Sequence, residues 1–315
     1  MAAILFGVGG LVLLLVGAEL LVRSGSRLAT RLGLSPVVIG LTVVSVGTSL
    51  PELAIGIDAA RSGSPGIATG NIVGTNLANL LLVLGLGALL RPVPFDRRTL
   101  RVDLPAVVAA ALLLFVLSRD GTIGPAGGAV LLVAALGYVV LVLRTAPREE
   151  VTAEADAGAG RGGTVVQLLV LAGSMGLVVL GAEWLVDGAV QGAQLLGVDD
   201  AVIGLTVVAL GTSAPELVTM LVAVARRESG IAVGNLVGSS VLNIALVLGA
   251  TVLAAPGATI AVPPDVVDSD LVLLVVATLG TALAMRTGAR LSRAEGAVMV
   301  AAYVAYLVWL VLTRT

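Results

Sequence analysis

Two long apolar stretches of this chain contain the same polar hexapeptide, Gly-Thr-Ser-x-Pro-Glu, which ends in a glutamate. The copies run from Gly47 to Glu52 and from Gly211 to Glu216. A charged side chain at the centre of a membrane-length helix is unfavourable by about 2.5–3.5 kcal/mol on insertion scales. Any fold of this sequence must therefore place both glutamates where protein, water or ions surround them.

The apolar stretches are long enough to cross a bilayer, which needs about 20 residues of helix. Hydrophobic residues make up 58% of the 315 residues and charged residues 12%, whereas soluble domains carry about 25% charged residues. The sequence predicts an all-α integral membrane protein with ten transmembrane helices. They are expected at residues 3–22, 36–60, 66–90, 104–118, 122–143, 164–186, 201–225, 230–253, 267–285 and 295–313.

Several chemistries are excluded because histidine, lysine and cysteine do not occur in the sequence. Disulfides, thiolate nucleophiles, histidine proton relays and serine-histidine hydrolase sites are ruled out. Neither His-Glu-x-x-His nor Gly-x-Ser-x-Gly is present. We therefore expect no enzyme, no cofactor and no nucleic-acid partner. The N-terminal stretch has no basic region before it, so we interpret it as a retained helix and not as a cleaved signal.

The two halves of the chain are related by an internal repeat. A shift of 164 positions aligns polar residues without a gap: Glu19 with Glu183, Glu52 with Glu216, Asn71 with Asn235, and Asn79 with Asn243. Chance similarity between apolar segments would not keep polar residues in register. We interpret residues 1–144 and 164–315 as two repeats of five helices, joined by a polar cytoplasmic linker at 145–163.

Arginine placement predicts the orientation. With the N-terminus outside, fifteen of the eighteen arginines fall in inner loops, and only Arg61, Arg119 and Arg314 fall outside. The positive-inside rule then predicts a multi-pass protein of the cell membrane with both termini extracytoplasmic. Because each half has an odd number of spans, the second half enters with opposite polarity. Inverted repeats are an architecture of secondary transporters, which bind substrate at the midplane between the repeats.

Oxygen-bearing side chains share one face in each of four expected helices. They are Thr42, Ser45, Thr48, Ser49 and Glu52; Asn71, Thr75 and Asn79; Thr206, Thr212, Ser213 and Glu216, with Ala209 at the position of Ser45; and Asn235, Ser239 and Asn243. Pro51 and Pro215 have no N–H and are expected to break the second and seventh helices, which frees carbonyl groups nearby. The backbones of Ser45 and Ala209 are the expected contributors, along with Thr48 and Thr212.

These oxygens suit a hard cation, since calcium takes about six to eight oxygen ligands. The two glutamates supply a charge of −2, which one Ca²⁺ or two or three Na⁺ can balance. Two close carboxylates without a cation repel each other, so we expect protons to compete with the metal. The predicted metal ligands are Glu52, Glu216, Thr48, Thr212, Ser49, Ser213, Asn79, Asn243, Thr75, Ser239, Ser45 and Ala209.

Other repeated features favour structural roles. The small-residue motifs Gly70 to Gly74 and Gly234 to Gly238 indicate close helix packing. Glu19 stands four residues before Arg23 and can pair with it. For Glu19 and Glu183 we therefore favour a structural or gating role over metal ligation.

At these motifs the sequence resembles the cation/calcium exchanger superfamily, specifically its prokaryotic sodium/calcium exchangers. Residues 40–85 and 204–249 match that family's alpha repeats. The resemblance implies alternating-access antiport across the bilayer, with Ca²⁺ and Na⁺ as substrates. We also expect a monomeric functional unit. By matching motif positions, the resemblance implies that Glu52 and Glu216 bridge calcium with Thr48 and Thr212. Sodium would bind Ser49, Thr75, Ser213, Ser239 and the carbonyls of Ser45 and Ala209.

Alternatives stay open within and beyond this family. A Ca²⁺/H⁺ antiporter would use the same site, although Gly70 to Gly74 looks more like the sodium branch. Asn243 stands where some relatives, including potassium-dependent ones, have aspartate, so potassium coupling is not expected. A channel or a cation sensor is a third hypothesis, but inverted repeats with broken helices favour alternating access.

Overall fold

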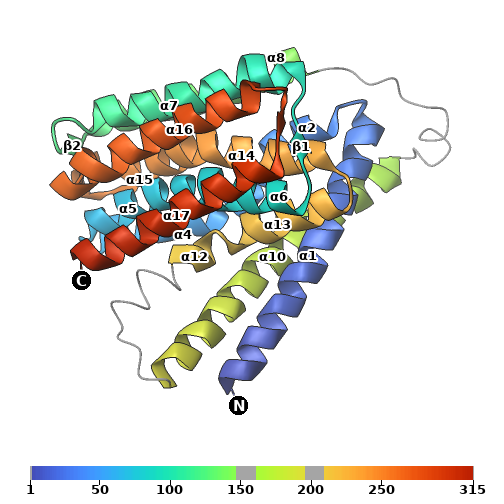
Figure 1. Ribbon diagram of the computed structural model, residues 1–315, viewed down its shortest axis with the longest axis horizontal. Helices are drawn as coiled ribbons and strands as arrows, with labels where there is room; N and C mark the ends of the chain where they lie inside the picture. The colour runs from blue at the N-terminus through green and yellow to red at the C-terminus, as the bar shows by residue number, and fades with distance from the viewer. Residues whose placement is uncertain (1, 147–160, 196–208, 315) are drawn as a thin grey trace.

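The computed structural model describes residues 2–146, 161–195 and 209–314. Within that part, nine helical segments are long and apolar enough to span a membrane. The seventh expected helix is described only from α12 (Ala209–Thr212) and α13 (Ala214–Ala225) onward. Residues 201–208, including Thr206, and linker residues 147–160 lie outside the described part. The all-helical membrane fold is confirmed (Figure 1).

Within the described residues the two repeats have closely similar orders of elements, with π-turns (η) inserted in several helices; the short helix η6 occurs in the second repeat alone. The first repeat comprises α1 (Ala2–Leu32), α2 (Pro36–Ile39), η1 (Gly40–Val44), α3 (Ser45–Thr48), α4 (Leu50–Arg61), α5 (Pro65–Leu77), η2 (Ala78–Val83), α6 (Leu84–Leu90), β1 (Val93–Pro94), η3 (Thr99–Asp103), α7 (Leu104–Leu117), β2 (Thr122–Ile123) and α8 (Pro125–Thr145). The second comprises α10 (Arg161–Leu195), α12, α13, α14 (Ser229–Leu242), η5 (Asn243–Val247), α15 (Leu248–Ala254), η6 (Pro256–Ala258, 3₁₀), β3 (Ile260–Ala261), η7 (Val266–Asp270), α16 (Leu271–Arg286), β4 (Arg290–Leu291) and α17 (Arg293–Arg314).

The first helix of each repeat is longer than the sequence suggested. α1 has 31 residues and α10 has 35, against expected spans of 3–22 and 164–186. A helix of 31 residues is about 46 Å long, more than the hydrocarbon core, so such helices tilt. Figure 1 shows α1 and α10 packed together and running obliquely to the other helices. The expectation was wrong because Arg23, Arg27 and Arg31 were assigned to a loop, whereas they continue α1.

Two short strand pairs show that the repeats are inverted. β1 and β3 follow the third span of their repeats, and β2 and β4 precede the fifth. β1 pairs with β4, and β2 pairs with β3, both antiparallel. The two pairs lie at opposite ends of the molecule (Figure 1), here called the β1–β4 end and the β2–β3 end. Equivalent strands of the two repeats therefore lie at opposite ends, as inversion requires.

The third and eighth spans form the centre of the protein. Their most apolar windows are 78% and 83% buried, whereas those of α1, α8, α10 and α17 are each 28% buried. A helix that is apolar on all sides and exposed suits contact with lipid. The central helices α5 and α14 carry the predicted ligands Thr75 and Ser239, and the π-turns η2 and η5 that follow them carry Asn79 and Asn243.

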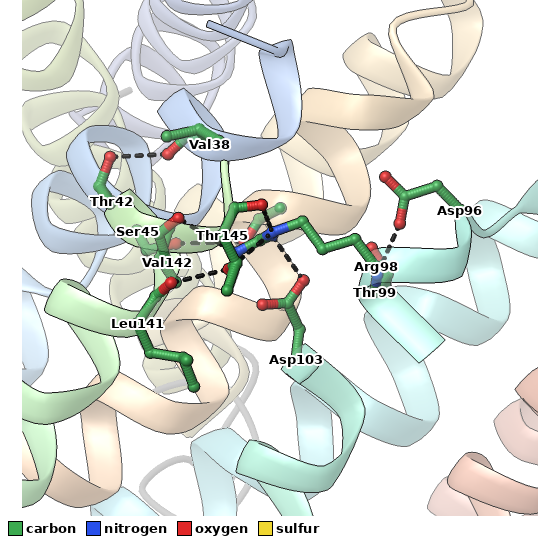
Figure 2. Close-up of polar contacts among 11 residues, drawn as sticks. Val38, Thr42, Ser45, Asp96, Arg98, Thr99, Asp103, Leu141, Val142 and Thr145 are labelled. Carbon is green, nitrogen blue, oxygen red and sulfur yellow. Dashed lines mark hydrogen bonds and ion pairs between the residues drawn. The ribbon is translucent and has the colours of Figure 1, made fainter. Parts of the chain in front are cut away.

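A buried ion pair fixes the end of α8 to the start of the fourth span. Arg98 donates to the Asp103 carboxylate at 2.9 Å, and the side chains are 9% and 0% exposed. Arg98 also donates to the carbonyl oxygens of Val142 and Thr145 at 3.4 and 3.2 Å (Figure 2). Those carbonyls belong to the last turn of α8, where helical partners are lacking.

Replacing Arg98 with alanine is expected to destabilise the protein by about 3–5 kcal/mol, because the buried Asp103 carboxylate loses its counter-charge. Thermal unfolding in detergent would show this as a lower melting temperature. Arg97→Ala, at the exposed neighbouring position, serves as the control and should change little. An Arg98→Ala melting temperature equal to that of Arg97→Ala would contradict the interpretation.

Candidate cation-binding site

Both glutamates follow the same break in a transmembrane helix. Ser49 and Ser213 each have φ −87° and ψ 2°, which interrupts the helix between α3 and α4 and between α12 and α13. Glu52 and Glu216 then lie in the first turn of α4 and α13, where the partial positive charge of a helix N-terminus favours a carboxylate. The two copies of the motif have thus adopted the same local structure.

The glutamates are completely buried and lie close enough for their charges to interact. Both have 0% exposure, and the charge of Glu216 acts on Glu52. None of their four carboxylate oxygens has a hydrogen-bond partner among the described residues. Buried polar atoms are normally paired, so four unpaired carboxylate oxygens at one place are the arrangement expected of ligands for a cation.

Asn79 is the second residue of the π-turn η2, and Asn243 is the first residue of the π-turn η5. Both are 0% exposed, and neither side-chain amide has a partner among the described residues. α4 packs against η5 and α13 packs against η2, so each glutamate helix meets the asparagine turn of the other repeat. π-turns within helices frequently occur at functional sites.

Hydroxyl groups of one repeat join the site of the other. The Thr48 hydroxyl donates to Oδ1 of Asn235 at 3.1 Å and lies 3.3 Å from the Ser239 hydroxyl. The hydroxyls of Thr48 and Ser239 lie beside the Glu216 carboxylate, although the contacts fall outside hydrogen-bond geometry. Asn235 was noted in the repeat but was not predicted as a ligand; its role here is to hold Thr48.

The Ser45 region differs from the expectation of a freed carbonyl. The Ser45 carbonyl accepts the Ser49 N–H at 3.1 Å, and the Ser45 hydroxyl donates to the carbonyls of Gly40 and Asn235 at 2.6 and 2.9 Å. The Ser45 carbonyl therefore accepts a helical bond, and the Thr48 hydroxyl also lies within hydrogen-bond distance of it, at 3.4 Å. Thr42 bonds the Val38 carbonyl of its own helix at 2.7 Å (Figure 2).

The remaining predicted ligands lie around the breaks. The hydroxyls of Ser49 and Ser213 are buried without a partner in the described part of the chain. Thr75, 2% exposed, and Thr212 line a common cavity. Ala209 is the first residue of α12.

Two buried hydroxyls on these helices lie outside the predicted set of ligands, those of Thr219 and Thr251. Each is 0% exposed and has no partner among the described residues. Thr219 follows Glu216 on α13 by one turn. An isolated hydroxyl in an apolar helix gives no signal, because most such groups bond their own backbone.

The donor set is poor in charge and rich in neutral oxygen. Within the described residues, no three His, Cys, Asp or Glu side chains gather to hold a metal. Two carboxylates surrounded by amides, hydroxyls and helix-end carbonyls can still meet the coordination of Ca²⁺ or Na⁺, which bind hard oxygen ligands.

The two ends of the site differ in packing. At the β1–β4 end, α14 packs against α2, η1 and α3. A Cβ added to Gly238 would overlap the Ser45 hydroxyl and lie 2.6 Å from the Leu41 carbonyl oxygen, which confirms the expected close packing for this motif. At the β2–β3 end, a Cβ on Gly70 or Gly74 would meet no described atom within 4 Å, so the close packing expected for that copy of the motif was wrong for this conformation. There a cavity of about 460 Å³ extends to Asn71, Thr75 and Thr212.

Glu19 forms ion pairs and is not part of the site. It pairs with Arg23 at 2.7 Å and also with Arg226 at the end of α13, which ties α1 to the glutamate-bearing helix. Its repeat partner Glu183 instead lines a crevice of about 260 Å³ with Asp187 and Thr212. The pairing predicted for Glu19 with Arg23 is confirmed.

Inverted helical repeats that meet at a buried carboxylate pair define a membrane transporter of the secondary type. Comparison with known proteins identifies the family. Residues 2–144 and 166–312 each match the family described as sodium/calcium exchanger protein. The chain belongs to the sodium/calcium exchanger family of membrane antiporters, and it is not an enzyme.

Similar proteins cover nearly the whole chain. It is 32% identical to the sodium/calcium exchanger MaX1 of Methanosarcina acetivorans, over 95% of each chain. It is also 32% identical to the inner membrane protein YrbG of Escherichia coli, over 96% of this chain and 94% of that protein. Among solved structures, the sodium-calcium exchanger NCX_Mj, soaked with Na⁺ and Ca²⁺, matches with a TM-score of 0.85 and 29% identity over 98% of each chain.

Proposed function

We propose that this protein exchanges Na⁺ for Ca²⁺ across the cell membrane by alternating access to the Glu52–Glu216 site. One observation carries the proposal: the two glutamates, one from each inverted repeat, are completely buried together and have four carboxylate oxygens without protein partners among the described residues. Leaving two such charges without a counter-ion is strongly unfavourable. A transported cation supplies the missing charge.

The proposed ligands divide between the two ions. Ca²⁺ is bridged by Glu52 and Glu216 with the oxygens of Thr48 and Thr212, and the amides of Asn79 and Asn243 complete its shell. Na⁺ ions use Ser49, Ser213, Thr75, Ser239 and the carbonyls of Ser45 and Ala209. The names of MaX1 and NCX_Mj support sodium as the coupling ion. We also propose the repeat boundaries 1–144 and 164–315, a monomeric functional unit and extracytoplasmic termini.

Alternating access is supported by the difference between the two ends. α14 seals the β1–β4 end, while the β2–β3 end contains the cavity next to Thr75 and Thr212. In an inverted repeat, exchanging the conformations of the two halves exchanges the open end for the closed one. With the termini outside, the β2–β3 end faces the outside and the β1–β4 end faces the cytoplasm.

The test is ⁴⁵Ca²⁺ uptake into proteoliposomes loaded with Na⁺ or with acid buffer. We expect uptake to require an outward Na⁺ gradient and to stop when choline replaces Na⁺. Uptake driven equally well by an outward proton gradient without Na⁺ would instead assign the Ca²⁺/H⁺ alternative. Calcium flux that is independent of both counter-ions would contradict antiport and favour a channel.

A further inference from the structure

We propose that Asp265 and Asp270 form an acidic vestibule that concentrates cations at the β2–β3 end of the site. In the first repeat the position equivalent to Asp265 is taken by Arg98, which neutralises Asp103. The inference rests on the proposed function, since it assigns these two residues a role in the access of the transported cations. It follows from comparing the π-turns of the two repeats, η3 and η7.

The two π-turns occupy equivalent positions at opposite ends of the molecule. η3 (Thr99–Asp103) precedes α7, and η7 (Val266–Asp270) precedes α16. Aligning their ends places Asp103 on Asp270 and Arg98 on Asp265. A tyrosine of the fifth helix of each repeat accompanies the second aspartate. Tyr138 lies beside Asp103, and the Tyr306 hydroxyl lies 3.4 Å from Oδ1 of Asp270.

The aspartate–tyrosine pair is thus duplicated, but its neighbour has the opposite charge. In the first repeat, Arg98 and Asp103 form a buried neutral pair (Figure 2). In the second repeat, the same two positions carry two carboxylates. The repeats therefore differ in charge at symmetric places: one end has a guanidinium beside a carboxylate, and the other end has two carboxyl groups.

The acidic pair lines the cavity that leads to the cation site. Asp265 and Asp270 lie in its wall with Tyr303 and Tyr306, and no basic residue is among the described residues of that wall. Asp265 is exposed, whereas Asp270 is 4% exposed. The cavity reaches Thr75, which is 2% exposed, and Asn71, whose buried Nδ2 has no partner among the described residues. The acidic wall of the cavity and its polar end at Asn71 and Thr75 therefore belong to one continuous space.

Such an arrangement acts on cations before they reach the buried glutamates. A cleft lined by charge of one sign between low-dielectric walls raises the local concentration of counter-ions and their on-rate by about 10–10³-fold. Because the first repeat has a neutral pair at the equivalent place, the effect is confined to the β2–β3 end. The vestibule therefore lowers the apparent Michaelis constant for cations presented to that end alone.

The test measures Ca²⁺ transport in right-side-out and inside-out membrane vesicles, at low ionic strength set with choline chloride. Asp265→Asn is expected to raise the apparent KM for Ca²⁺ about tenfold at the β2–β3 end, with the maximal rate and the opposite-end KM unchanged. Asp265→Arg, which copies the first repeat, should raise it further. Asp265→Glu, which keeps the carboxylate, should have the native KM for Ca²⁺ at that end. The differences should shrink at about 150 mM choline chloride, where the Debye length is about 8 Å.

Asp268→Asn is the matched control, since Asp268 is an exposed carboxylate in η7, three residues after Asp265, and does not line the cavity. Equal KM values for Asp265→Asn and Asp268→Asn would overturn the vestibule, and so would a change in maximal rate without a change in KM. Absence of sodium-driven calcium flux in the native protein would instead refute the proposed function. The two failures are therefore distinguishable in the same vesicles.

Discussion

Glutamine at position 52 or 216 is expected to abolish calcium exchange. Each substitution keeps the size of the side chain but removes half of the charge of a completely buried pair. Removing one partner of a buried ionic interaction is unfavourable by about 3–5 kcal/mol, so calcium affinity should fall at least about a hundredfold. Because the two glutamates follow identical breaks in inverted helices, the two single variants should fail to a similar degree.

Ca²⁺-dependent thermal stabilisation in detergent provides a second readout that needs no transport. A ligand that binds only the folded state raises the melting temperature, so Ca²⁺ should stabilise the native protein but neither glutamine variant. Asp58→Asn is the control, because Asp58 is an exposed carboxylate on the same helix as Glu52. Calcium stabilisation that survives in Glu52→Gln or Glu216→Gln would remove the basis for placing the ion between them.

Alanine at position 238 is expected to hold the protein open at the β1–β4 end. A Cβ there overlaps the Ser45 hydroxyl and crowds the Leu41 carbonyl, so α14 can no longer pack against the broken helix. The equivalent substitution in the first repeat, Gly74→Ala, is tolerated by the present conformation, since its Cβ meets no described atom. By inversion, Gly74→Ala should instead obstruct closure of the β2–β3 end. Both variants should exchange calcium slowly. Gly238→Ala should leave the β1–β4 end open, and Gly74→Ala should leave the β2–β3 end open.

The natural absence of cysteine makes this prediction easy to test. Val38→Cys introduces a single thiol at a position that is 1% exposed in the sealed β1–β4 half. A membrane-impermeant maleimide should label it faster from that end in the Gly238→Ala background and slower, or not at all, in the Gly74→Ala background. Equal labelling in both backgrounds would show that these glycines do not control the seal.

The sequence predicted the membrane fold, the duplication and its inversion, since these follow from apolar length, register and arginine placement. Glu52 and Glu216 could be selected for the same reason: a carboxylate beside a proline in a membrane helix has few structural explanations. Pairing of Glu19 with Arg23 followed from helical spacing. That the predicted ligands bind cations stays a prediction.

Other features could not be read from the sequence, because they depend on how the repeats pack. A π-turn adds one residue to a helical turn without changing composition, so η2 and η5 left no signal at Asn79 and Asn243. The ion pair of Arg98 with Asp103 and its hydrogen bonds to the last turn of α8 depend on how the helices pack. The extent of α1 was missed because arginine at a helix end marks the membrane boundary and not the end of the helix.

The strand pairs β1–β4 and β2–β3 each take one strand from either half of the chain, as does the site itself. A single half could therefore neither complete a strand pair nor enclose its glutamate. An ancestral five-helix protein of this kind would have had to insert in both orientations and assemble as an antiparallel homodimer. With both halves on one chain, the two copies are free to differ, as they do where Arg98, which neutralises Asp103 in the first half, corresponds to Asp265 in the second.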